Sequence, residues 1–434
     1  MIIVDSALAE RVRADNPVRV GVVGAGFSGA HIVHQIITAV PGLRVVAVAN
    51  RTLAHAEAAY HRAGVEWTRC VTDPTALQRS IFAREYAVTE DPAVVWNCRD
   101  IDVVIEATGT IEYGARVALE SIRHGKHVVL VNAEMDATVG PILRQYADRA
   151  GVVFTDTDGD EPGVAMNMLR FVRSIGLEPV VAGNLKGLYD RYRNPTTQAD
   201  FARRNNQKAE AMTSFADGTK LSMELAVLAN ASGFGVARRG MYGPGLDDVY
   251  AAPAYYADKL IDGGMVDFLC GARPANGAFV LGRTDDPVRA DYLRYLKMGD
   301  GPLYAFYTPF HLPHLEVPNT VARAALMGDA AVTPQGRPVA DAVAVAKRDL
   351  RAGETLDGIG GYCCYALLEN YADARSENLL PMGVSADCVL GRDVAKDTAL
   401  TYADIELPDE RLCDRLRTEQ DALLRSKSTV AMFA

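Results

Sequence analysis

The middle of the chain carries a loop whose residue types suit metal binding or proton transfer. Residues 155–163 read Thr-Asp-Thr-Asp-Gly-Asp-Glu-Pro-Gly, so four carboxylates precede an apolar helical pattern. One interpretation is a Mg²⁺ or Mn²⁺ site formed by Asp158, Asp160 and Glu161, because hard cations prefer carboxylate oxygens. The other is a helix N-terminus, where acidic side chains bind free amides and complement the helix dipole. The position before a helix favours capping, and the two interpretations can coexist.

Two lysines further along the chain are candidates for moving a proton. Lys186 lies just past a predicted strand over residues 179–183, and partial desolvation there would lower its pKa so that it protonates an oxyanion. Lys220 and Glu224 are four residues apart and share one face of a predicted helix. A surface ion pair is the plain interpretation. The buried apolar pattern over residues 225–233 supports a second one, in which Lys220 holds an anion or proton and Glu224 orients it.

A glycine pattern near the N-terminus predicts a site for a dinucleotide. Gly24, Gly26 and Gly29 stand between an apolar strand over residues 18–23 and an apolar helix. The first glycine allows a tight turn, the second lets the backbone approach a pyrophosphate, and the third permits close helix-strand packing. We expect cofactor contacts from four segments: Gly24, Gly26, Phe27, Ser28 and Gly29; Asn50, Arg51 and Thr52; Ala107, Thr108 and Gly109; and Asn132.

The end of the second strand indicates which nicotinamide cofactor is bound. An acidic residue normally stands about 20 residues past the last glycine and binds a ribose hydroxyl of NAD. Here the strand over residues 45–49 is followed by Asn50, Arg51 and Thr52. A neutral amide beside an arginine suits a ribose phosphate, so we predict NADP, although Arg51 could instead stack on the adenine.

Strands and helices alternate through the first third of the chain and predict the sheet that positions these residues. Strands are expected over 101–109, 126–132 and 152–154, with a helix around 115–124, and such alternation implies a parallel sheet. A mostly helical excursion is expected between residues 53 and 86, and residues 1–16 read as a short amphipathic helix.

Part of this pattern resembles a known family. Glu-Ala-Thr-Gly at 106–109, Gly-Lys-His-Val-Val at 125–129 and Asn132 are similar to the cofactor domain of homoserine dehydrogenases and their relatives. Homoserine dehydrogenases carry a catalytic lysine directly after that asparagine, where this chain has Ala133. They also carry an Asp-x-x-x-Lys pair on a comparable helix, whereas Lys220 and Glu224 have the opposite order. The resemblance therefore implies a related fold and a different substrate.

The resemblance is stronger to a branch that adds a C-terminal SAF (β-clip) domain and includes deoxyxylulose-5-phosphate reductoisomerase-like enzymes. Residues 348–356 are echoed by residues 392–400, which suggests paired hairpin units. These relatives also show a Pro-aromatic-His-Leu segment like the one around His311, which implies a functional histidine there, although a packed side chain is the usual role. The expected domains are a Rossmann NAD(P)-binding domain (1–157), an α+β substrate and dimerisation domain (158–335) and a small SAF-like β-clip domain (336–434).

Composition narrows the class of protein. The chain has 434 residues, a net charge of -10 and 49% hydrophobic residues, which fits an enzyme of two or three domains and argues against nucleic acid or an anionic membrane as the main partner. Its seven cysteines lack metal-type spacing, which suits reduced thiols in a cytoplasm. No signal or membrane-spanning pattern is seen, and we expect a homodimer that acts on a small molecule.

The resemblance implies an NADPH-dependent reductoisomerase reaction of isoprenoid biosynthesis, in which a metal holds two oxygens of deoxyxylulose 5-phosphate during rearrangement and reduction. Lys186, Lys220, Glu224 and His311 would be the catalytic residues. One alternative is a simple NAD(P)-dependent dehydrogenase of a polyol, sugar acid or amino-acid semialdehyde. Another, of a different class, is an NADPH-binding sensor or partner-binding protein without turnover.

Overall fold

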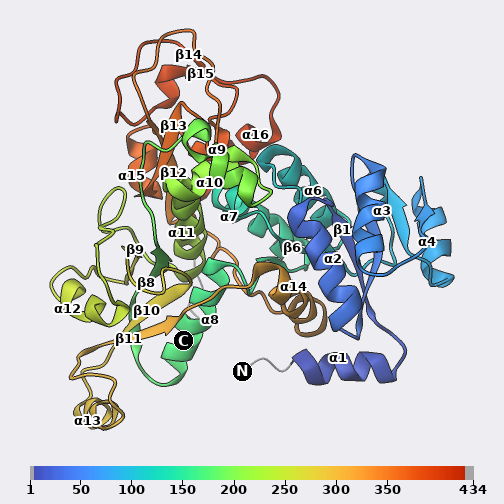
Figure 1. Ribbon diagram of the computed structural model, residues 1–434, viewed down its shortest axis with the longest axis horizontal. Helices are drawn as coiled ribbons and strands as arrows, with labels where there is room; N and C mark the ends of the chain where they lie inside the picture. Colours follow the sequence, from blue (N-terminus) through green and yellow to red (C-terminus); the bar gives the residue numbers. More distant parts are fainter. Residues whose placement is uncertain (1–3, 426–434) are drawn as a thin grey trace.

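The computed structural model describes residues 4–425, and its N-terminal unit (residues 4–157) is built on a seven-stranded parallel sheet (Figure 1). The strand order is β3-β4-β2-β1-β5-β6-β7. Successive strands are therefore added first on one side of β1 and then on the other, and open α/β sheets bind ligands at the point where this order switches. The strands are β1 (Val18–Val23), β2 (Leu43–Ala49), β3 (Arg69–Cys70), β4 (Ala87–Thr89), β5 (Val103–Glu106), β6 (His127–Leu130) and β7 (Phe154–Asp156). The predicted Rossmann architecture is confirmed.

Helices cover this sheet, as the alternation predicts. They are α1 (Val4–Arg13), α2 (Phe27–Ala39), α3 (Leu53–Arg62), α4 (Pro74–Phe82), α5 (Ala93–Trp96), α6 (Ile111–Arg123) and α7 (Ala133–Ala150). The excursion expected to be mostly helical between residues 53 and 86 also contains β3, and β4 follows at once. Both strands extend the edge of the sheet beside β2. They are two and three residues long, too short for the period of a strand to be read from the sequence.

The middle unit (residues 158–335) surrounds a four-stranded mixed sheet in the order β11-β10-β8-β9. Its strands are β8 (Glu178–Lys186), β9 (Met265–Cys270), β10 (Ala278–Arg283) and β11 (Leu303–Thr308). Its helices are α8 (Glu161–Ser174), α9 (Pro195–Arg204), α10 (Ala209–Ala216), α11 (Thr219–Ser232), η1 (Val249–Ala251), α12 (Ala252–Tyr256), α13 (Pro287–Tyr295), α14 (Pro313–Ala322) and η2 (Arg323–Met327).

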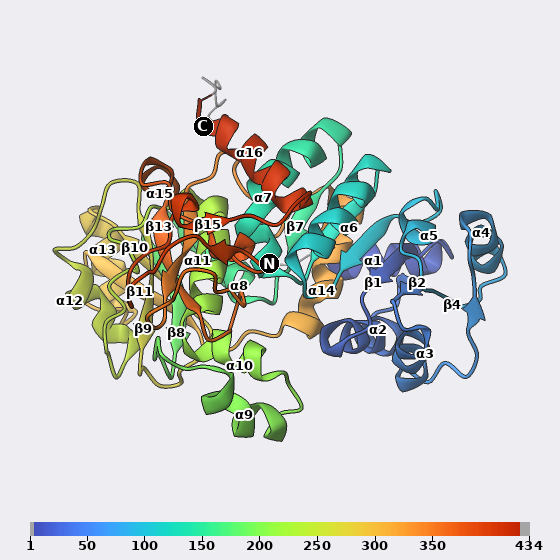
Figure 2. The same ribbon diagram turned by 90° about the horizontal axis from the view of Figure 1, so that it is seen from above.

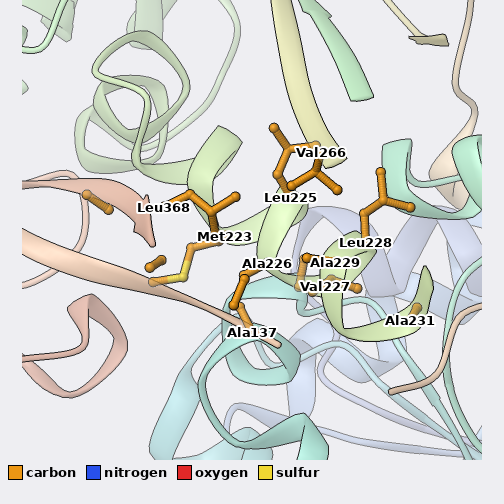
Figure 3. Close-up of a cluster of buried hydrophobic side chains, with 14 of the residues drawn as sticks. Ala137, Met223, Leu225, Ala226, Val227, Leu228, Ala229, Ala231, Val266 and Leu368 are labelled. Atoms are coloured by element: carbon orange, nitrogen blue, oxygen red, sulfur yellow. The ribbon is translucent and has the colours of Figure 1, made fainter. Parts of the chain in front are cut away.

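Helix α11 lies at the centre of the molecule. Every residue of this helix except Lys220 is buried, because α7, α8, β9, β12 and β13 pack around it. Figure 3 shows Met223, Leu225 and Leu228 of α11 in this core, together with Val266 and Leu368 from neighbouring strands. A helix that is apolar on all sides is a buried helix, which confirms the prediction for residues 225–233 and makes Lys220 and Glu224 exceptions that need an explanation.

One segment of the middle unit packs back onto the N-terminal unit. Val317 and Val321 of α14 share a core cluster with Val20 of β1 and Ile32 of α2. Val4 and Leu8, on the buried face of α1, belong to the same cluster. The loop that enters α14, which carries His311, is therefore held beside the glycine turn.

The C-terminal unit (residues 336–425) is made of short strands and one long helix. Its elements are β12 (Ala340–Ala346), β13 (Cys364–Asn370), α15 (Tyr371–Ser376), η3 (Met382–Val384), β14 (Val389–Leu390), η4 (Tyr402–Asp404), β15 (Ile405–Glu406) and α16 (Leu412–Arg425). The two echoed segments lie side by side, since Leu350 and Val394 exchange backbone hydrogen bonds of 2.9 and 3.0 Å. Helix α16 packs against α6 and α7 of the N-terminal unit (Figure 2).

The sequence analysis also made predictions about the cysteines and about membrane-spanning segments. All seven cysteines are free thiols. Within residues 4–425, no helix has the length and apolar character that crossing a bilayer requires.

Candidate active site

The glycine turn has the geometry that the sequence predicts. Gly24 adopts φ +104°, and a Cβ built there would lie 2.4 Å from the backbone oxygen of Ala107. A Cβ on Gly29 would lie 1.9 Å from the oxygen of Gly24, so the helix approaches the strand closely enough to exclude any side chain. Nothing lies within 4 Å of the Cβ position of Gly26, which leaves the backbone open beside the first amides of α2.

Asn50 braces the turn from the neighbouring strand. Its Oδ1 accepts a hydrogen bond from the Ala25 amide at 3.0 Å, and its Nδ2 donates to the Thr52 oxygen at 2.8 Å. The side chain is thus engaged in shaping the turn. Arg51 is exposed at the mouth of the site and makes no ion pair within the described chain, so its charge is available to a ligand.

A second loop is fixed by the buried Glu106 at the end of β5. Its Oε1 accepts hydrogen bonds from both the amide and the hydroxyl of Thr108, at 2.8 and 2.5 Å. Asn132, which caps α7, donates from Nδ2 to the Thr110 oxygen at 3.0 Å. The loop over residues 108–110 is therefore held at the carboxyl edge of the sheet, on the side where the predicted nicotinamide would lie.

Beyond this edge, two lysines meet across one carboxylate. Nζ of Lys186, at the end of β8, lies 3.5 Å from Oε2 of Glu224, and Nζ of Lys220 lies 3.5 Å from Oε1 of the same residue. Lys186 also lies 2.7 Å from Oε2 of Glu161, and Lys220 lies 3.3 Å from Oε1 of Glu134. The predicted catalytic residues Lys186, Lys220 and Glu224 thus form one cluster rather than a surface ion pair.

Glu134 places this cluster against the N-terminal unit. It lies in the first turn of α7, two residues after Asn132, so Lys220 faces the edge where Thr108 and Asn132 lie. Lys186 occupies the opposite side, on the sheet of the middle unit. The cluster therefore lies between the predicted cofactor site and the middle unit.

Burial and neighbouring charges set the protonation of the cluster. Glu224 has its pKa lowered to about 2, because the attraction of Lys186 and Lys220 outweighs its desolvation. Burial, followed by repulsion from Glu224, raises the pKa of Glu161 well above its usual range, and burial raises that of Asp160. Two ammonium groups then face the ionised carboxylate of Glu224, with Glu161 and Glu134 as further partners.

The predicted lowering of the Lys186 pKa is wrong. Desolvation does lower its pKa, but the carboxylates of Glu161 and Glu224 together raise the pKa above that of a free lysine. The same balance, led by Glu134 and Glu224, raises the pKa of Lys220. Both side chains are therefore charged hydrogen-bond donors at neutral pH, and they can protonate an alkoxide because an alkoxide is a far stronger base than an amine.

Two buried polar atoms in the cluster have no hydrogen-bond partner within the described chain. They are Oδ1 of Asn184 and Nδ1 of His311. The His311 ring lies 3.9 Å from Glu161, and burial lowers its pKa, so it is neutral. Unpaired buried atoms are costly, and their presence beside the lysines marks the place where polar groups of a substrate would bind.

The predicted metal site is not formed. Asp158 turns away from the cluster and is enclosed by Arg323, by Thr320 at 2.9 Å and by Asn167 at 2.9 Å. Glu161 is bound to Lys186. No group of three metal-binding side chains with suitable geometry exists among residues 4–425, and a lysine between carboxylates does not fit a divalent cation. We therefore derive no chemical step through a metal.

The acidic loop does precede a helix, as the capping interpretation predicts, but the predicted capping hydrogen bond is not formed. Helix α8 begins at Glu161, and Asp160 occupies its N-cap position, yet the Asp160 side chain makes no capping hydrogen bond. Its pKa responds to Lys220, Glu224 and His311, which places it at the edge of the cluster. The acidic loop is divided between an internal ion pair at Asp158 and the candidate active site at Asp160 and Glu161.

Sequence reasoning missed Glu134 and Asn184 as site residues and assigned Glu161 to a metal. Nδ2 of Asn184 donates to Glu161 at 2.9 Å and to Glu224 at 3.1 Å. Its position two residues before Lys186 on one strand was a usable signal, since alternate residues share a face. Glu134 offered no such signal, because its partner is 86 residues away.

Two segments of the chain match models of known protein families. The model of the homoserine dehydrogenase NAD-binding domain matches residues 24–155, and that of the oxidoreductase DRL catalytic domain matches residues 159–317. A homoserine dehydrogenase from Synechocystis sp. (strain ATCC 27184 / PCC 6803 / Kazusa) is 29% identical over 185 residues. That match covers 40% of this chain and 42% of the relative, so it spans well under half of either protein.

Comparison with solved structures finds a homoserine dehydrogenase and a DOX-P reductoisomerase. A homoserine dehydrogenase from Thiobacillus denitrificans is 17% identical and aligns with a TM-score of 0.46, covering 87% of this chain and 97% of its own. A DOX-P reductoisomerase, solved with fosmidomycin and magnesium, is 16% identical with a TM-score of 0.34, covering 48% and 56%. Residues 24–155 are thus similar to an NAD-binding domain of the homoserine dehydrogenase type, and residues 159–317 are similar to the catalytic domain of oxidoreductase DRL.

Proposed function

We propose that the protein is an NADP-dependent oxidoreductase that interconverts a small, uncharged hydroxy-carbonyl compound and its alcohol. The observation that carries this proposal is the bridging of Lys186 and Lys220 by one buried carboxylate, Glu224, beside the predicted nicotinamide edge. Hydride transfer to a carbonyl creates an alkoxide, and two fixed ammonium groups can stabilise and protonate it.

Each residue has a role in this proposal. Lys220 faces the cofactor side. It would donate a hydrogen bond to the carbonyl oxygen and protonate that oxygen after the hydride has added to the carbonyl carbon. Lys186 holds a neighbouring hydroxyl, and Glu224 fixes the spacing of the two lysines. The neutral His311 and Asn184 offer their unpaired atoms to the remaining polar groups of the substrate. NADP would supply the hydride at the edge formed by Thr108 and Asn132.

The charge of the cluster favours an uncharged substrate over a phosphorylated one. Both lysines are already paired with carboxylates, and no unpaired cation lies among the residues described for the cluster. Phosphate groups are bound by free arginines, lysines or helix N-termini. The ketone or aldehyde form of an uncharged polyol fits these contacts better than a sugar phosphate.

The resemblance noted in the sequence favours a second candidate, the metal-assisted rearrangement and reduction of deoxyxylulose 5-phosphate. This reaction needs carboxylates that converge on a cation, and Asp158 is unsuited to that role because Arg323 and Thr320 occupy it.

The two candidates differ in metal dependence, which absorbance of NADPH can measure. Purified protein is incubated with NADPH, a chelator and a panel of uncharged hydroxy-aldehydes, hydroxy-ketones and semialdehydes, and separately with deoxyxylulose 5-phosphate plus Mn²⁺ or Mg²⁺. NADPH oxidation that persists in chelator supports the simple reduction. Oxidation that requires both the phosphorylated ketone and the metal would replace it with the rearrangement.

A further inference from the structure

A groove between α2 and α3 extends the predicted cofactor site away from the lysine cluster. It has a volume of about 390 Å³ and begins at Ala25, Gly26 and Phe27 of the glycine turn. Its other lining residues are Ala30 and His31 of α2, His55, Ala58, Ala59 and Arg62 of α3, and Asn206. A pyrophosphate on the first amides of α2 would direct the adenosine end of the cofactor toward this side of the sheet.

The charge of this groove is opposite to that of the whole chain. The net charge is -10, yet no carboxylate lines the groove, and His31, His55 and Arg62 are all basic. Arg62, at the end of α3, makes no ion pair within the described chain, and neither does Arg51, which precedes that helix. An arginine without a carboxylate partner beside two histidines suits a phosphate dianion.

Asn206 comes from the middle unit rather than from the unit that carries the rest of the groove. Helices α9 and α10 form an arm, residues 194–216, and Asn206 lies at its tip with φ +52°. Figure 2 shows this arm extending from the body of the molecule on the side of α2 and α3. The tip also carries basic residues, Arg203, Arg204 and Lys208.

The base of the arm is closed by one buried lysine of the C-terminal unit. Nζ of Lys347, which follows β12, donates to the Arg193 oxygen at 2.8 Å and to Oδ2 of Asp217 at 2.9 Å. These two partners stand at the two ends of the arm. The same Nζ donates to the Gly361 oxygen at 2.7 Å, so the C-terminal unit fixes where the arm begins and ends.

We propose that this groove binds the ribose phosphate of NADP through His55 and Arg62, and that Asn206 at the tip of the arm closes over it. The inference rests on the proposed use of NADP. It assigns the arm to cofactor recognition and gives the C-terminal unit a role, which is to hold the arm in place through Lys347.

Equilibrium binding of NADPH and NADH, followed by cofactor fluorescence, tests the groove without requiring turnover. Arg62→Ala and Asn206→Asp should each weaken NADPH binding 5- to 50-fold and leave NADH binding unchanged, because only NADPH carries the ribose phosphate. Asparagine and aspartate both tolerate positive φ, so the second change adds a charge without backbone strain. His61→Ala on α3 is the matched control, since His61 is exposed and does not line the groove.

Trypsin gives a second readout on the arm itself. Cleavage after Arg203, Arg204 or Lys208 should be slowed by NADPH and by adenosine 2′,5′-bisphosphate, but not by NADH or adenosine 5′-monophosphate. Equal protection by NADH and NADPH would overturn the proposed closure.

The binding data separate failure of this inference from failure of the proposed cofactor preference. Wild-type protein that binds NADH as tightly as NADPH would contradict both. A clear NADPH preference that survives in Arg62→Ala and Asn206→Asp would leave the proposed function intact and overturn this inference alone.

Discussion

At the scale of single residues, the central feature is a charge cluster whose members neutralise one another. Glu224 is fully ionised because two lysines attract it, and the lysines are fully charged because Glu161, Glu224 and Glu134 surround them. Isolated charges at these buried positions would shift toward their neutral forms. The cluster therefore delivers two fixed ammonium groups to the edge of the sheet at neutral pH.

The role of Lys220 can be tested by removing its charge while keeping its volume. Lys220→Met should lower kcat by a factor of about 10² to 10⁴, because the alkoxide loses its proton donor, while NADPH affinity changes little. Steady-state kinetics and cofactor titration measure the two effects. Lys259→Met, on a lysine that pairs with an exposed carboxylate, is the control. An unchanged kcat in Lys220→Met would refute the assigned role.

The raised pKa of the buried Asp136 predicts how the free energy of unfolding depends on pH. Its carboxyl is 1% exposed, neither oxygen has a hydrogen-bond partner within the described chain, and burial raises its pKa to about 7. The folded state thus keeps a proton that the unfolded state loses near pH 4, so stability falls as pH rises between about 4 and 7. Between pH 5 and 8 this group should account for a loss of about 2–3 kcal/mol.

Asp136→Asn cannot ionise, so the variant should lack this part of the pH dependence. Urea unfolding at pH 5 and pH 8 measures the difference in unfolding free energy. Asp300→Asn, at an exposed carboxylate, should retain the wild-type difference. If Asp136→Asn and wild type lose the same stability over this range, the raised pKa is disproved.

At the scale of elements, strand ends and helix starts bring the site together. Lys186 ends β8, Asn132 caps α7, and α2 begins directly after Gly26. The positions of α2 and of most of β8 agree with the hydrophobic pattern, whereas no helix was predicted directly after Asn132. The excursion after residue 53 was the least accurate part of the prediction, because short edge strands leave too few residues to show alternation.

The close approach of α2 to β1 makes a sharp prediction at Gly29. A Cβ there would lie 1.9 Å from the Gly24 oxygen, which is backbone and cannot turn aside. Gly29→Ala should therefore displace α2 and weaken NADPH binding at least 10-fold, measured by fluorescence titration. Gly26→Ala places its Cβ in open space and should leave the fold intact, as thermal unfolding would show. Wild-type cofactor affinity in Gly29→Ala would exclude this tight turn.

At the scale of the whole molecule, the C-terminal unit joins the other two. Arg417 of α16 lies 2.5 Å from Asp341 of β12 and donates to the Thr138 oxygen of α7 at 3.0 Å, all in the interior. Breaking such a buried pair from one side leaves a charge without its main partner.

Arg417→Met should therefore lower the unfolding free energy by about 3 kcal/mol in urea titration, although Arg375 at 3.5 Å retains part of the attraction on Asp341. Arg415→Met, exposed on the same helix, should change stability by less than about 0.5 kcal/mol. Equal effects of the two substitutions would show that α16 does not depend on this contact.

The sequence was sufficient for the Rossmann sheet, the buried α11 and the glycine turn, because each depends on local periodicity or on residues close in the chain. It was insufficient for the chemistry of the acidic loop. Whether Asp158 or Glu161 faces the site depends on Arg323 and Lys186, which lie 165 and 25 residues away. The predicted direction of the Lys186 pKa shift was wrong for the same reason, since its carboxylate neighbours come from other elements.

The most direct test of the account is transfer of deuterium from NADPH labelled at C4 of the nicotinamide. Protein, labelled NADPH, chelator and an accepted uncharged hydroxy-carbonyl compound are incubated together, and the alcohol product is analysed by mass spectrometry and NMR. The account predicts one deuterium on the former carbonyl carbon in wild type and a strongly reduced yield in Lys220→Met. Tight NADPH binding with no label transferred to any carbonyl compound would contradict it and show a cofactor-binding protein without turnover.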